Sequence, residues 1–553
     1  MSVLKATKLI QKKKILLLLL IGFLLSIWSQ SNTVSLPNPA WIASEVVSTE
    51  SNGISLWPSL AIDSQDNVHV VWSDTTDYLS SGTDNDIFHK YWNATTTTWS
   101  TTGVLSTEST GISQFPSLSI DSLDNVHVAW HDVTDYLSSG TDFDIFYKYW
   151  NATTTTWSTT GVLSTESNGT SQYPSLSTDN LDNVHVAWTD NTNYLSSGTD
   201  YDIFYKQWNA TITTWSNTEV VSTESTGNSR EPSMAIDGQD NKHVVWYERT
   251  DYLSSGIDAD IFYKHWNATT STWGSTEMIS TESASDSFVP NLVIDRQDNV
   301  HVAWEDNTDY LSSDTDSDIF HKYWNVTTIT WSNTEVVSIE STGNSLLPSL
   351  VTDSQDNIHV AWYDNTDYLG SDTDFDIFHK YWNATTTTWS IAEVVSIEST
   401  GDSVWPSLVT DNQDNIHVTW HDNTDYLNSG TDIDIFYKLG INSDVMTQTV
   451  TDIEISTVTD IETSTVTNTE TSTETGPTVT ESTIVTETAP TIFVTETLIG
   501  PTEMITETKT ETQTSIDASD TPVPLIPIVL AVVLLGIYRY AISRSRTDQF
   551  NKL

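Results

Sequence analysis

The sequence contains no cysteine among its 553 residues, and it carries few basic side chains. No disulfide can staple the fold, so its stability must come from packing and from any bound ions. Lysine and arginine number 21 against 75 aspartates and glutamates, which gives a formal net charge of −54. This charge excludes electrostatic binding to nucleic acid or to anionic lipid headgroups. It favours cations, cationic partners, or solubility in saline or acidic surroundings.

Long apolar runs are confined to the two ends of the chain. Residues 1–31 combine five lysines with the run ILLLLLIGFLLSIW, a pattern typical of a secretory signal peptide. Residues 522–542 predict one transmembrane helix, and residues 543–553 a short basic cytoplasmic tail. We therefore expect a single-pass protein of the plasma membrane with its main domain outside the cell. An uncleaved signal anchor and a processed C-terminal sorting signal remain open alternatives.

A change of composition marks a separate segment at residues 444–521, which are dominated by threonine, serine and glutamate. Such a segment cannot bury a core, and its like charges repel one another. We expect a disordered, extended stalk. O-glycosylation of its threonines and a bare flexible linker are both open interpretations.

The middle of the chain is a repeat of 58 residues. Seven tryptophans keep this spacing without interruption, at Trp72, Trp130, Trp188, Trp246, Trp304, Trp362 and Trp420. Seven prolines keep the same spacing, at Pro58, Pro116, Pro174, Pro232, Pro290, Pro348 and Pro406. Short β-branched and aromatic runs punctuated by Asp, Asn, Ser and Gly predict four strands in each unit, at about 59–63, 68–73, 86–92 and 98–105 in the first. Four strands in such a unit are typical of a propeller blade.

The ends of the repeat predict a closed ring. The seventh unit stops after its third strand at Lys438, and the missing fourth strand stands at the other end of the array, in Trp41–Ser48. An N-terminal strand that completes the last blade leaves no open sheet edge. We therefore predict an all-β fold, a seven-bladed β-propeller over residues 36–441. A solenoid would need caps at both ends, and separate domains of 58 residues would have small cores.

One loop of each unit is rich in aspartate and contains an Asp-x-Asp pair. Carboxylates beside hydroxyl and carbonyl oxygens suit Ca²⁺, the one candidate cofactor, although no loop of the EF-hand kind is present. The alternatives are aspartates that cap turns, or an ion pair between one aspartate and the lysine of the third strand, such as Lys90. The candidate ligands are Asp84, Asp86, Asp142, Asp144, Asp200, Asp202, Asp258, Asp260, Asp316, Asp318, Asp374, Asp376, Asp432 and Asp434.

Sequons for N-glycosylation recur at the turn between the third and fourth strands. An exported domain exposes such turns to modification. The candidate acceptors are Asn93, Asn151, Asn209, Asn267, Asn325 and Asn383, with Asn168 in another loop. Glycans there would shield one face and leave the Asp-rich face free for binding.

Two further sets of repeated side chains have simpler interpretations. The histidine of the second strand, such as His69, is expected to hydrogen-bond between neighbouring strands, and the repeated tryptophans to pack between blades. Trp57 and Trp405 precede their prolines at a position that Phe115 and Tyr173 also occupy. An aromatic ring repeated at this position is a candidate for stacking on a sugar.

The unit PSLAIDSQDNVHVVW resembles the repeats of sialidase-like, Asp-box propellers and of seven-bladed propeller lectins, whose ligands are carbohydrates. The resemblance covers the seven units, but Asn67 stands where that family has a glycine. Sialidases also clamp a carboxylate with three arginines. The extracellular part has only Arg230, Arg249 and Arg296, at positions that are not equivalent. The resemblance therefore implies no catalytic residue here, and we predict that the chain is not an enzyme.

The loops of the seven units are almost copies of one another, whereas an enzyme needs one asymmetric site. Repetition favours multivalent binding of an extracellular glycan or of a surface protein. We therefore predict a membrane-anchored recognition or adhesion protein. A structural surface coat without a defined ligand is the first alternative, and a sialidase-like glycoside hydrolase is the second.

Overall fold

The computed structural model describes residues 39–442 except 253–255, 312, 314–315, 369–370, 372, 428 and 431, and in addition residues 495–499 and 504–508. The predicted signal peptide, transmembrane segment and cytoplasmic tail lie outside these residues. No helix within the described part of the chain is long and apolar enough to cross a membrane.

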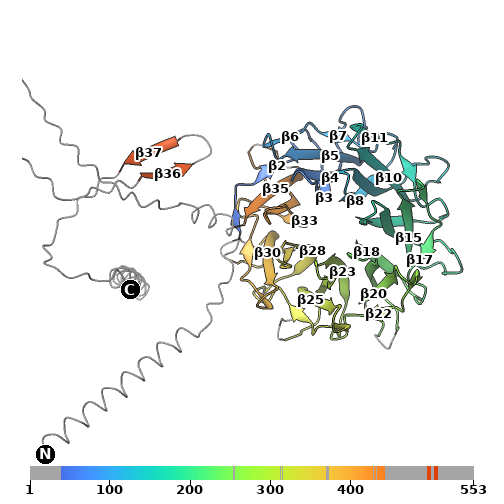
Figure 1. Cartoon of the computed structure of the whole chain (residues 1–553). Coiled ribbons are helices and arrows are strands. Elements are labelled where there is room, and N and C mark those ends of the chain that lie inside the picture. Colours follow the sequence, from blue (N-terminus) through green and yellow to red (C-terminus); the bar gives the residue numbers. More distant parts are fainter. Residues whose placement is uncertain are drawn as a thin grey trace, which may run out of the picture. The chain divides into compact units, whose positions relative to one another are not determined.

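Seven antiparallel sheets surround a central axis, each sheet forming one blade (Figure 1). The first blade runs outward from the axis in the order β3-β4-β5-β6, and β7 also pairs with β5. The bounds of its strands are β3 (Ser55–Ile62), β4 (Val68–Asp74), β5 (Asp86–Asn93), β6 (Thr98–Trp99) and β7 (Gly103–Val104). The all-β propeller predicted from the 58-residue period is confirmed.

The other blades repeat this order of strands. Their innermost strands are β8 (Ser113–Ile120), β13 (Ser171–Thr178), β18 (Ser229–Ile236), β23 (Ser287–Ile294), β28 (Ser345–Thr352) and β33 (Ser403–Thr410). The second strands are β9 (Val126–Asp132), β14 (Val184–Asp190), β19 (Lys242–Glu248), β24 (Val300–Asp306), β29 (Ile358–Asp364) and β34 (Ile416–Asp422). The third strands are β10 (Asp144–Asn151), β15 (Asp202–Asn209), β20 (Asp260–Asn267), β25 (Asp318–Asn325), β30 (Asp376–Asn383) and β35 (Asp434–Ile441).

The outermost strand of each blade is split into two pieces of two residues each. In the second to sixth blades these are β11 (Thr156–Trp157), β12 (Gly161–Val162), β16 (Thr214–Trp215), β17 (Glu219–Val220), β21 (Thr272–Trp273), β22 (Glu277–Met278), β26 (Thr330–Trp331), β27 (Glu335–Val336), β31 (Thr388–Trp389) and β32 (Glu393–Val394). The continuous fourth strand predicted at 98–105 is therefore wrong in detail. The chain leaves the ladder between the two pieces because Thr102 turns inward, where its hydroxyl donates to Glu50 at 2.7 Å.

The N-terminal strands close the ring as predicted. Strands β1 (Ala40–Trp41) and β2 (Glu45–Val46) both pair with β35 of the seventh blade, with Trp41 opposite Gly440 and Val46 opposite Phe436. The first and last parts of the propeller thus share one sheet, and no third strand is left with a free edge.

The hydrophobic core lies between neighbouring blades. Val71 and Ile87 of the first blade pack against Val126 and Trp130 of the second, and equivalent clusters recur around the ring. Each repeated tryptophan is fully buried, and the indole N–H of Trp130 donates to Asp132 at 3.1 Å. The conserved spacing of Trp-x-Asp within the repeat therefore satisfies a buried donor.

The histidines of the second strands have the structural role that we expected. In the second blade, His127 Nδ1 lies 2.6 Å from the Tyr147 hydroxyl, and its Nε2 lies 3.1 Å from Asp121. The ring thus joins the third strand to the turn between the first two strands. In the first blade the neighbour on the third strand is His89, at 3.2 Å from His69.

A buried lysine on the third strand of each blade clamps the preceding blade. The Lys90 ammonium donates to the Val47 carbonyl at 2.9 Å, to Thr49 at 2.8 Å and to Glu50 at 2.8 Å. The alternative of an ion pair between this lysine and an Asp-x-Asp aspartate is wrong, because the side chain crosses to the neighbouring blade. The seven pairs are Lys90–Glu50, Lys148–Glu108, Lys206–Glu166, Lys264–Glu224, Lys322–Glu282, Lys380–Glu340 and Lys438–Glu398. We call these pairs the lysine clamps.

A second unit of the chain contains a small hairpin. Strands β36 (Thr495–Ile499) and β37 (Met504–Thr508) pair antiparallel within the segment predicted as a stalk. The remainder of the predicted stalk lies outside the described residues.

We predict that Lys90→Ala lowers the free energy of unfolding by about 2–4 kcal/mol, because it leaves the buried Val47 carbonyl and the Glu50 carboxylate without their cation. Urea unfolding followed by tryptophan fluorescence measures the change. The control is Arg249→Ala, which removes an exposed ion pair with Asp286 and should cost less than about 1 kcal/mol. Equal effects of the two substitutions would refute the role assigned to the clamps.

Candidate functional site

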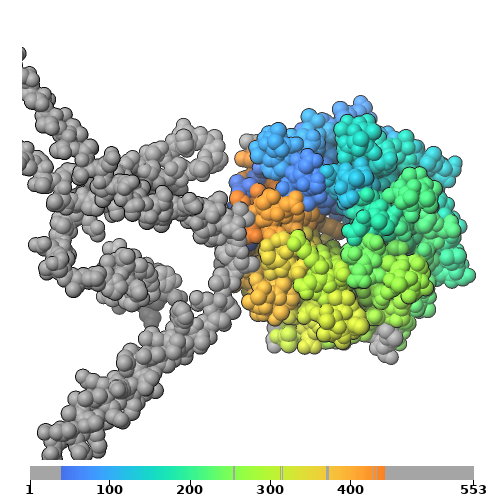
Figure 2. All heavy atoms as spheres, viewed as in Figure 1, coloured from blue at the N-terminus to red at the C-terminus, as the bar shows by residue number. Residues whose placement is uncertain are grey.

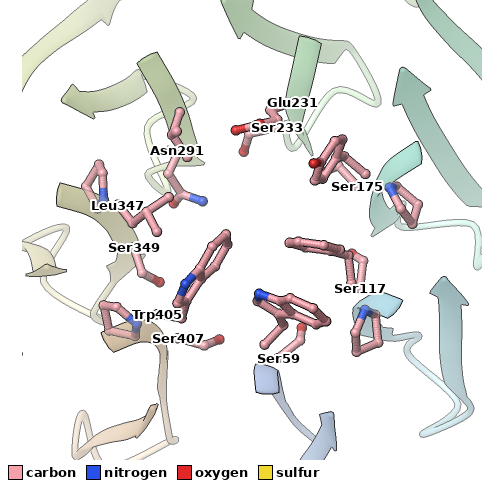
Figure 3. A pocket seen from close by; sticks show the side chains of 18 of the residues that line it. Ser59, Ser117, Ser175, Glu231, Ser233, Asn291, Leu347, Ser349, Trp405 and Ser407 are labelled. Carbon is pink, nitrogen blue, oxygen red and sulfur yellow. The ribbon is translucent and has the colours of Figure 1, made fainter. Parts of the chain in front are cut away.

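A cavity of about 270 Å³ lies on the propeller axis. Every blade contributes three consecutive residues of its innermost strand to the wall, and the middle one is always the repeated proline. Figure 2 shows the blades around this central hollow, and Figure 3 shows the side chains that line it. Since the innermost strand is a sheet edge, proline is tolerated there without the loss of a ladder hydrogen bond.

The residue before each proline is held in a strained conformation. The pairing between the first two strands of every blade shifts register at this point, for example between Leu56 and Ser59. The bulge re-aims one side chain toward the axis. The seven residues have positive φ values: Trp57 (53°), Phe115 (51°), Tyr173 (53°), Glu231 (50°), Val289 (45°), Leu347 (50°) and Trp405 (59°). We call them the axial ring. Positive φ is costly for side chains of this size, and such strain is often found at functional sites.

Hydrogen bonds from neighbouring blades hold the strained residues in place. The Trp57 amide donates to His421 at 3.4 Å, the Glu231 amide to Thr189 at 3.1 Å, and the Leu347 amide to Glu305 at 3.2 Å. The residue after each proline, a serine or Asn291, adds a second set of contacts. Ser117, for example, accepts from the Leu176 amide of the next blade at 3.0 Å. The axial ring is therefore fixed by the packing of the blades.

Four aromatic members of the axial ring form one continuous surface, the aromatic wall. The rings of Trp57 and Phe115 stack with centroids 4.2 Å apart. Tyr173 meets Phe115 edge-on at 4.8 Å, and Trp405 meets Phe115 at 5.6 Å. All four side chains are half-buried, so part of each ring faces the cavity. These four residues are the ones that occupy the repeated aromatic position before the proline, and their stacking on a sugar stays a prediction.

One glutamate lines the other side of the cavity, and a second belongs to the strand behind the axial ring. Glu231 belongs to the axial ring, and Glu305 of β24 stands behind Leu347, whose amide it accepts. Burial and the charge of Glu305 raise the pKa of Glu231 to about 7. Burial likewise raises the pKa of Glu305 to about 7. Carboxyls with pKa values near neutrality are candidates for binding or proton transfer.

Tyrosines and an arginine surround the two glutamates. Burial and the Glu231 charge raise the pKa of Tyr173, and burial and the Glu305 charge raise that of Tyr363. The Arg230 guanidinium lies over the Tyr201 ring at 4.0 Å from its centroid. The cavity is therefore aromatic over one half, and the other half of the axial ring adds one carboxyl, Glu231, and two apolar side chains, Val289 and Leu347.

The sequence analysis missed Glu231 and Glu305 because it compared what the units share. Residues at equivalent positions of the seven units form one column of the repeat. Five columns hold five or six residue types; one of them lines the axial cavity, and three others connect to it. The column of Trp57 is the axial ring itself. The columns that begin at Leu56, Ser73 and Asn85 contact it or one another, as in the bond of Asn85 to Ser73 at 3.0 Å. The fifth varied column begins at the exposed Thr101 on the outer strand.

This divergence corrects the argument that near-identical blades exclude an asymmetric site. The outer loops are nearly copied, but the axis carries a different side chain in almost every blade. Comparing the seven units column by column would have singled out Glu231 and Glu305 as varied positions, although the exposed column of Thr101 varies as much.

The predicted Asp-x-Asp residues lie at the start of the third strand of each blade. Asp86 is buried, and its Oδ1 accepts from Ser106 at 2.7 Å. Asp84 is half-buried. It lies so close to Gly82 that a Cβ atom added to this glycine would be 2.5 Å from Asp84 Oδ1. In the part of the chain that the structure describes, no group of three or more His, Asp or Glu side chains is arranged to hold a metal ion. The calcium site stays a prediction.

The predicted sequons lie where the strand pattern placed them. Asn93 ends β5, and its side-chain oxygen accepts from the Thr96 amide at 2.8 Å, which shapes the turn. Asn168 is exposed in the loop before β13. Modification of these asparagines stays a prediction.

The three arginines do not form a carboxylate clamp. Arg230 lies over Tyr201, Arg249 pairs with Asp286 at 3.1 Å, and Arg296 donates to the Ser354 carbonyl at 2.8 Å. Each arginine is thus engaged with a different partner within its own part of the ring.

Solved structures with a similar fold include glycan-acting enzymes. An ulvan lyase, described as a new polysaccharide lyase family, is 12% identical over 72% of this chain and 95% of its own, with a TM-score of 0.47. The NanB sialidase of Streptococcus pneumoniae is 12% identical over 75% of this chain and 73% of its own, with a TM-score of 0.40. A Dyadobacter fermentans protein of unknown function is 12% identical over 73% of this chain and 100% of its own, with a TM-score of 0.44.

These comparisons confirm the resemblance to sialidase-like propellers at the level of the fold. They contradict the prediction that the chain is not an enzyme, because neighbours with this fold are lyases and sialidases. We withdraw that prediction. No protein family matches the chain by sequence, and no curated protein does.

The buried aspartates of the blades contribute stability that is present in mild acid and lost toward neutral pH. Burial, which outweighs the hydrogen bonds from serine, raises the pKa of Asp86 to about 6, and similar shifts affect Asp144, Asp202, Asp318, Asp376 and Asp434. Since these groups bind protons more tightly when folded, the stability that they contribute should fall as pH rises from about 4 to 7. Buried histidines such as His131, whose pKa burial lowers to about 3, have the opposite effect in the same pH range. The pKa of Asp63 shifts in the direction opposite to that of Asp86. Burial acts to raise it, but hydrogen bonds from His69 and Asn67 outweigh burial and hold the pKa low. Such groups lose stability below about pH 4.

The melting temperature of the wild-type protein minus that of Asp86→Asn should therefore fall between pH 4 and pH 7, which thermal melts of both proteins at fixed ionic strength would measure. A difference that stays constant or rises over this range would contradict the assignment. If Ca²⁺ binds the Asp-x-Asp pairs, adding it should raise the melting temperature at pH 7.5 more than at pH 5, because the cation needs ionised carboxylates.

Proposed function

We propose that this protein binds a glycan outside the cell, at one site on the propeller axis, while its C-terminal segment anchors it in the plasma membrane. One observation carries the proposal. The seven copies of the repeat diverge chiefly where they line or adjoin the axial cavity. Repeated units that are otherwise copied leave no packing reason for six different residue types to converge on one point.

The chemistry of the cavity suits a sugar. A pyranose has an apolar C–H face and a rim of hydroxyls, so it needs an aromatic surface and nearby hydrogen-bonding groups. The aromatic wall supplies the first, and Glu231 and Asn291 supply the second. The volume of about 270 Å³ is near the lower end of ligand pockets, on the order of one sugar ring.

The location outside the cell rests on the sequence pattern of the two ends, which supports export, a stalk and one membrane span. A surface protein as the partner, Ca²⁺ in the Asp-rich loops and glycosylated sequons all remain proposals, and the single axial site replaces the multivalent binding that we expected of the seven loops. For the axial site we propose glycan binding only, whether or not the bound glycan is then cleaved.

Trp405→Ala should weaken glycan binding about tenfold to a hundredfold, because it removes one face of the aromatic wall. A glycan array with the full-length protein identifies a ligand, and isothermal titration measures its dissociation constant for wild type and variant. Trp405→Phe should recover most of the affinity, since it keeps an aromatic ring.

The matched control is Leu79→Ala, which removes a residue 74% exposed on an Asp-rich loop and should leave binding unchanged. If Leu79→Ala weakened glycan binding and Trp405→Ala left it unchanged, the ligand would lie on the loops instead. An array without any hit would count against the proposed function as a whole.

A further inference from the structure

A single blade departs from the repeat in the residue after the proline. This residue is a serine in six blades and Asn291 in the fifth. The Asn291 Oδ1 atom accepts from the Leu350 amide at 2.9 Å, in the same way that the Ser349 hydroxyl oxygen accepts from the Leu408 amide at 3.2 Å. The side-chain nitrogen of Asn291 is left with no acceptor among the residues that the structure describes, and it lies at the cavity wall (Figure 3). Asn291 therefore offers the cavity two N–H donors where a serine offers one hydroxyl.

The neighbouring blade presents an acceptor to the same cavity. Glu231 belongs to the axial ring, and in the described part of the chain no N–H or O–H group donates to its carboxylate. Burial and the charge of Glu305 raise the pKa of Glu231, whereas the charge of Arg230 lowers it. Because Arg230 balances part of the charge, a neutral N–H donor is enough to satisfy the carboxylate. Glu231 and Asn291 thus supply one acceptor and one donor from adjacent blades (Figure 3).

Two apolar side chains, Val289 and Leu347, stand beside this pair in the axial ring. Both are half-buried and line the cavity at a position that is aromatic in four other blades. Val289 has a φ of 45°, which is rare for a β-branched residue. A glycine would adopt this backbone without strain, so the side chain itself is what the position supplies. The cavity therefore places a small apolar surface next to the acceptor and the donor.

An acetamido group matches these three features together, because it has an N–H donor, a carbonyl acceptor and an apolar methyl group. A sugar hydroxyl can bond to either polar side chain, but it has no methyl group to cover Val289 and Leu347. A carboxylate, as in an acidic sugar, lacks the N–H donor. None of the described residues that line the cavity is a lysine, an arginine or a histidine, so a carboxylate would also lack a counter-charge there.

We propose that the axial cavity selects a glycan that carries an acetamido group. The N–H of this group donates to Glu231, its carbonyl accepts from Asn291, and its methyl group packs on Val289 and Leu347, while the sugar ring packs on the aromatic wall. This inference rests on the proposed function, because it specifies the class of glycan bound at the same site.

Four monosaccharide probes test the inference on the full-length protein at pH 8, where Glu231 is mostly ionised. They are the methyl β-glycosides of N-acetylglucosamine and N-acetylgalactosamine, and those of glucose and galactose, in which a hydroxyl replaces the acetamido group. At least one acetamido glycoside should bind at least about tenfold more tightly than its parent hexoside, since the parent loses two hydrogen bonds and a buried methyl group. Ligand-observed NMR titration measures these dissociation constants.

Asn291→Ser introduces the residue of the other six blades and keeps an oxygen for the Leu350 amide. It should lower the preference for the acetamido glycoside at least about threefold. Combining it with Glu231→Leu, which copies the leucine of the sixth blade, should bring the preference to within about twofold. The control, Asn193→Ser, removes an exposed asparagine from an Asp-rich loop and should keep the full preference.

The inference would be overturned if both parent hexosides bound as tightly as their acetamido forms, if none of the four probes bound, or if the preference survived the double substitution. Equal binding of both kinds of sugar that is lost in Trp405→Ala would overturn it and leave the proposed glycan site standing. The inference and the proposed function can therefore fail separately.

Discussion

The lysine clamp is the interaction on which the ring depends. Each clamp buries an ammonium group between two blades and satisfies it with a carbonyl, usually a threonine hydroxyl, and a glutamate from the preceding blade. Lys90 makes this contact across the seam, where the first blade meets the sheet that β1 and β2 complete. Without cysteines, the chain has no covalent closure, so this polar contact and the apolar packing beside it must keep the ring shut.

Closure determines what can happen at the axis. Because the blades are held at fixed positions, the residue before each proline is forced by its bulge to point inward, at positive φ. The position of the residue is therefore fixed, yet its side chain varies, as the six residue types of the axial ring show. A symmetric scaffold with an asymmetric centre is the result. The strain is borne by inter-blade hydrogen bonds such as that of Glu231 to Thr189.

Most of the fold and part of the site could be predicted from the sequence. The unbroken spacing of Trp72 and its equivalents determined the number of blades, and the stray strand at Trp41 revealed the closure. The partner of Lys90 could not be read, because its clamp joins residues of different units. Trp57 was visible as an aromatic repeat, whereas Glu231 looked like a break in that repeat. The bulge that turns both toward the axis has no signature in the alternation of apolar residues.

The central claim is that the seven-fold frame carries one ligand site. Native mass spectrometry of the intact protein with a saturating saccharide identified on the array tests it directly, because it counts bound ligands on each chain. The account predicts a single bound molecule at saturation. A series extending toward seven would contradict it and would place recognition on the repeated Asp-rich loops.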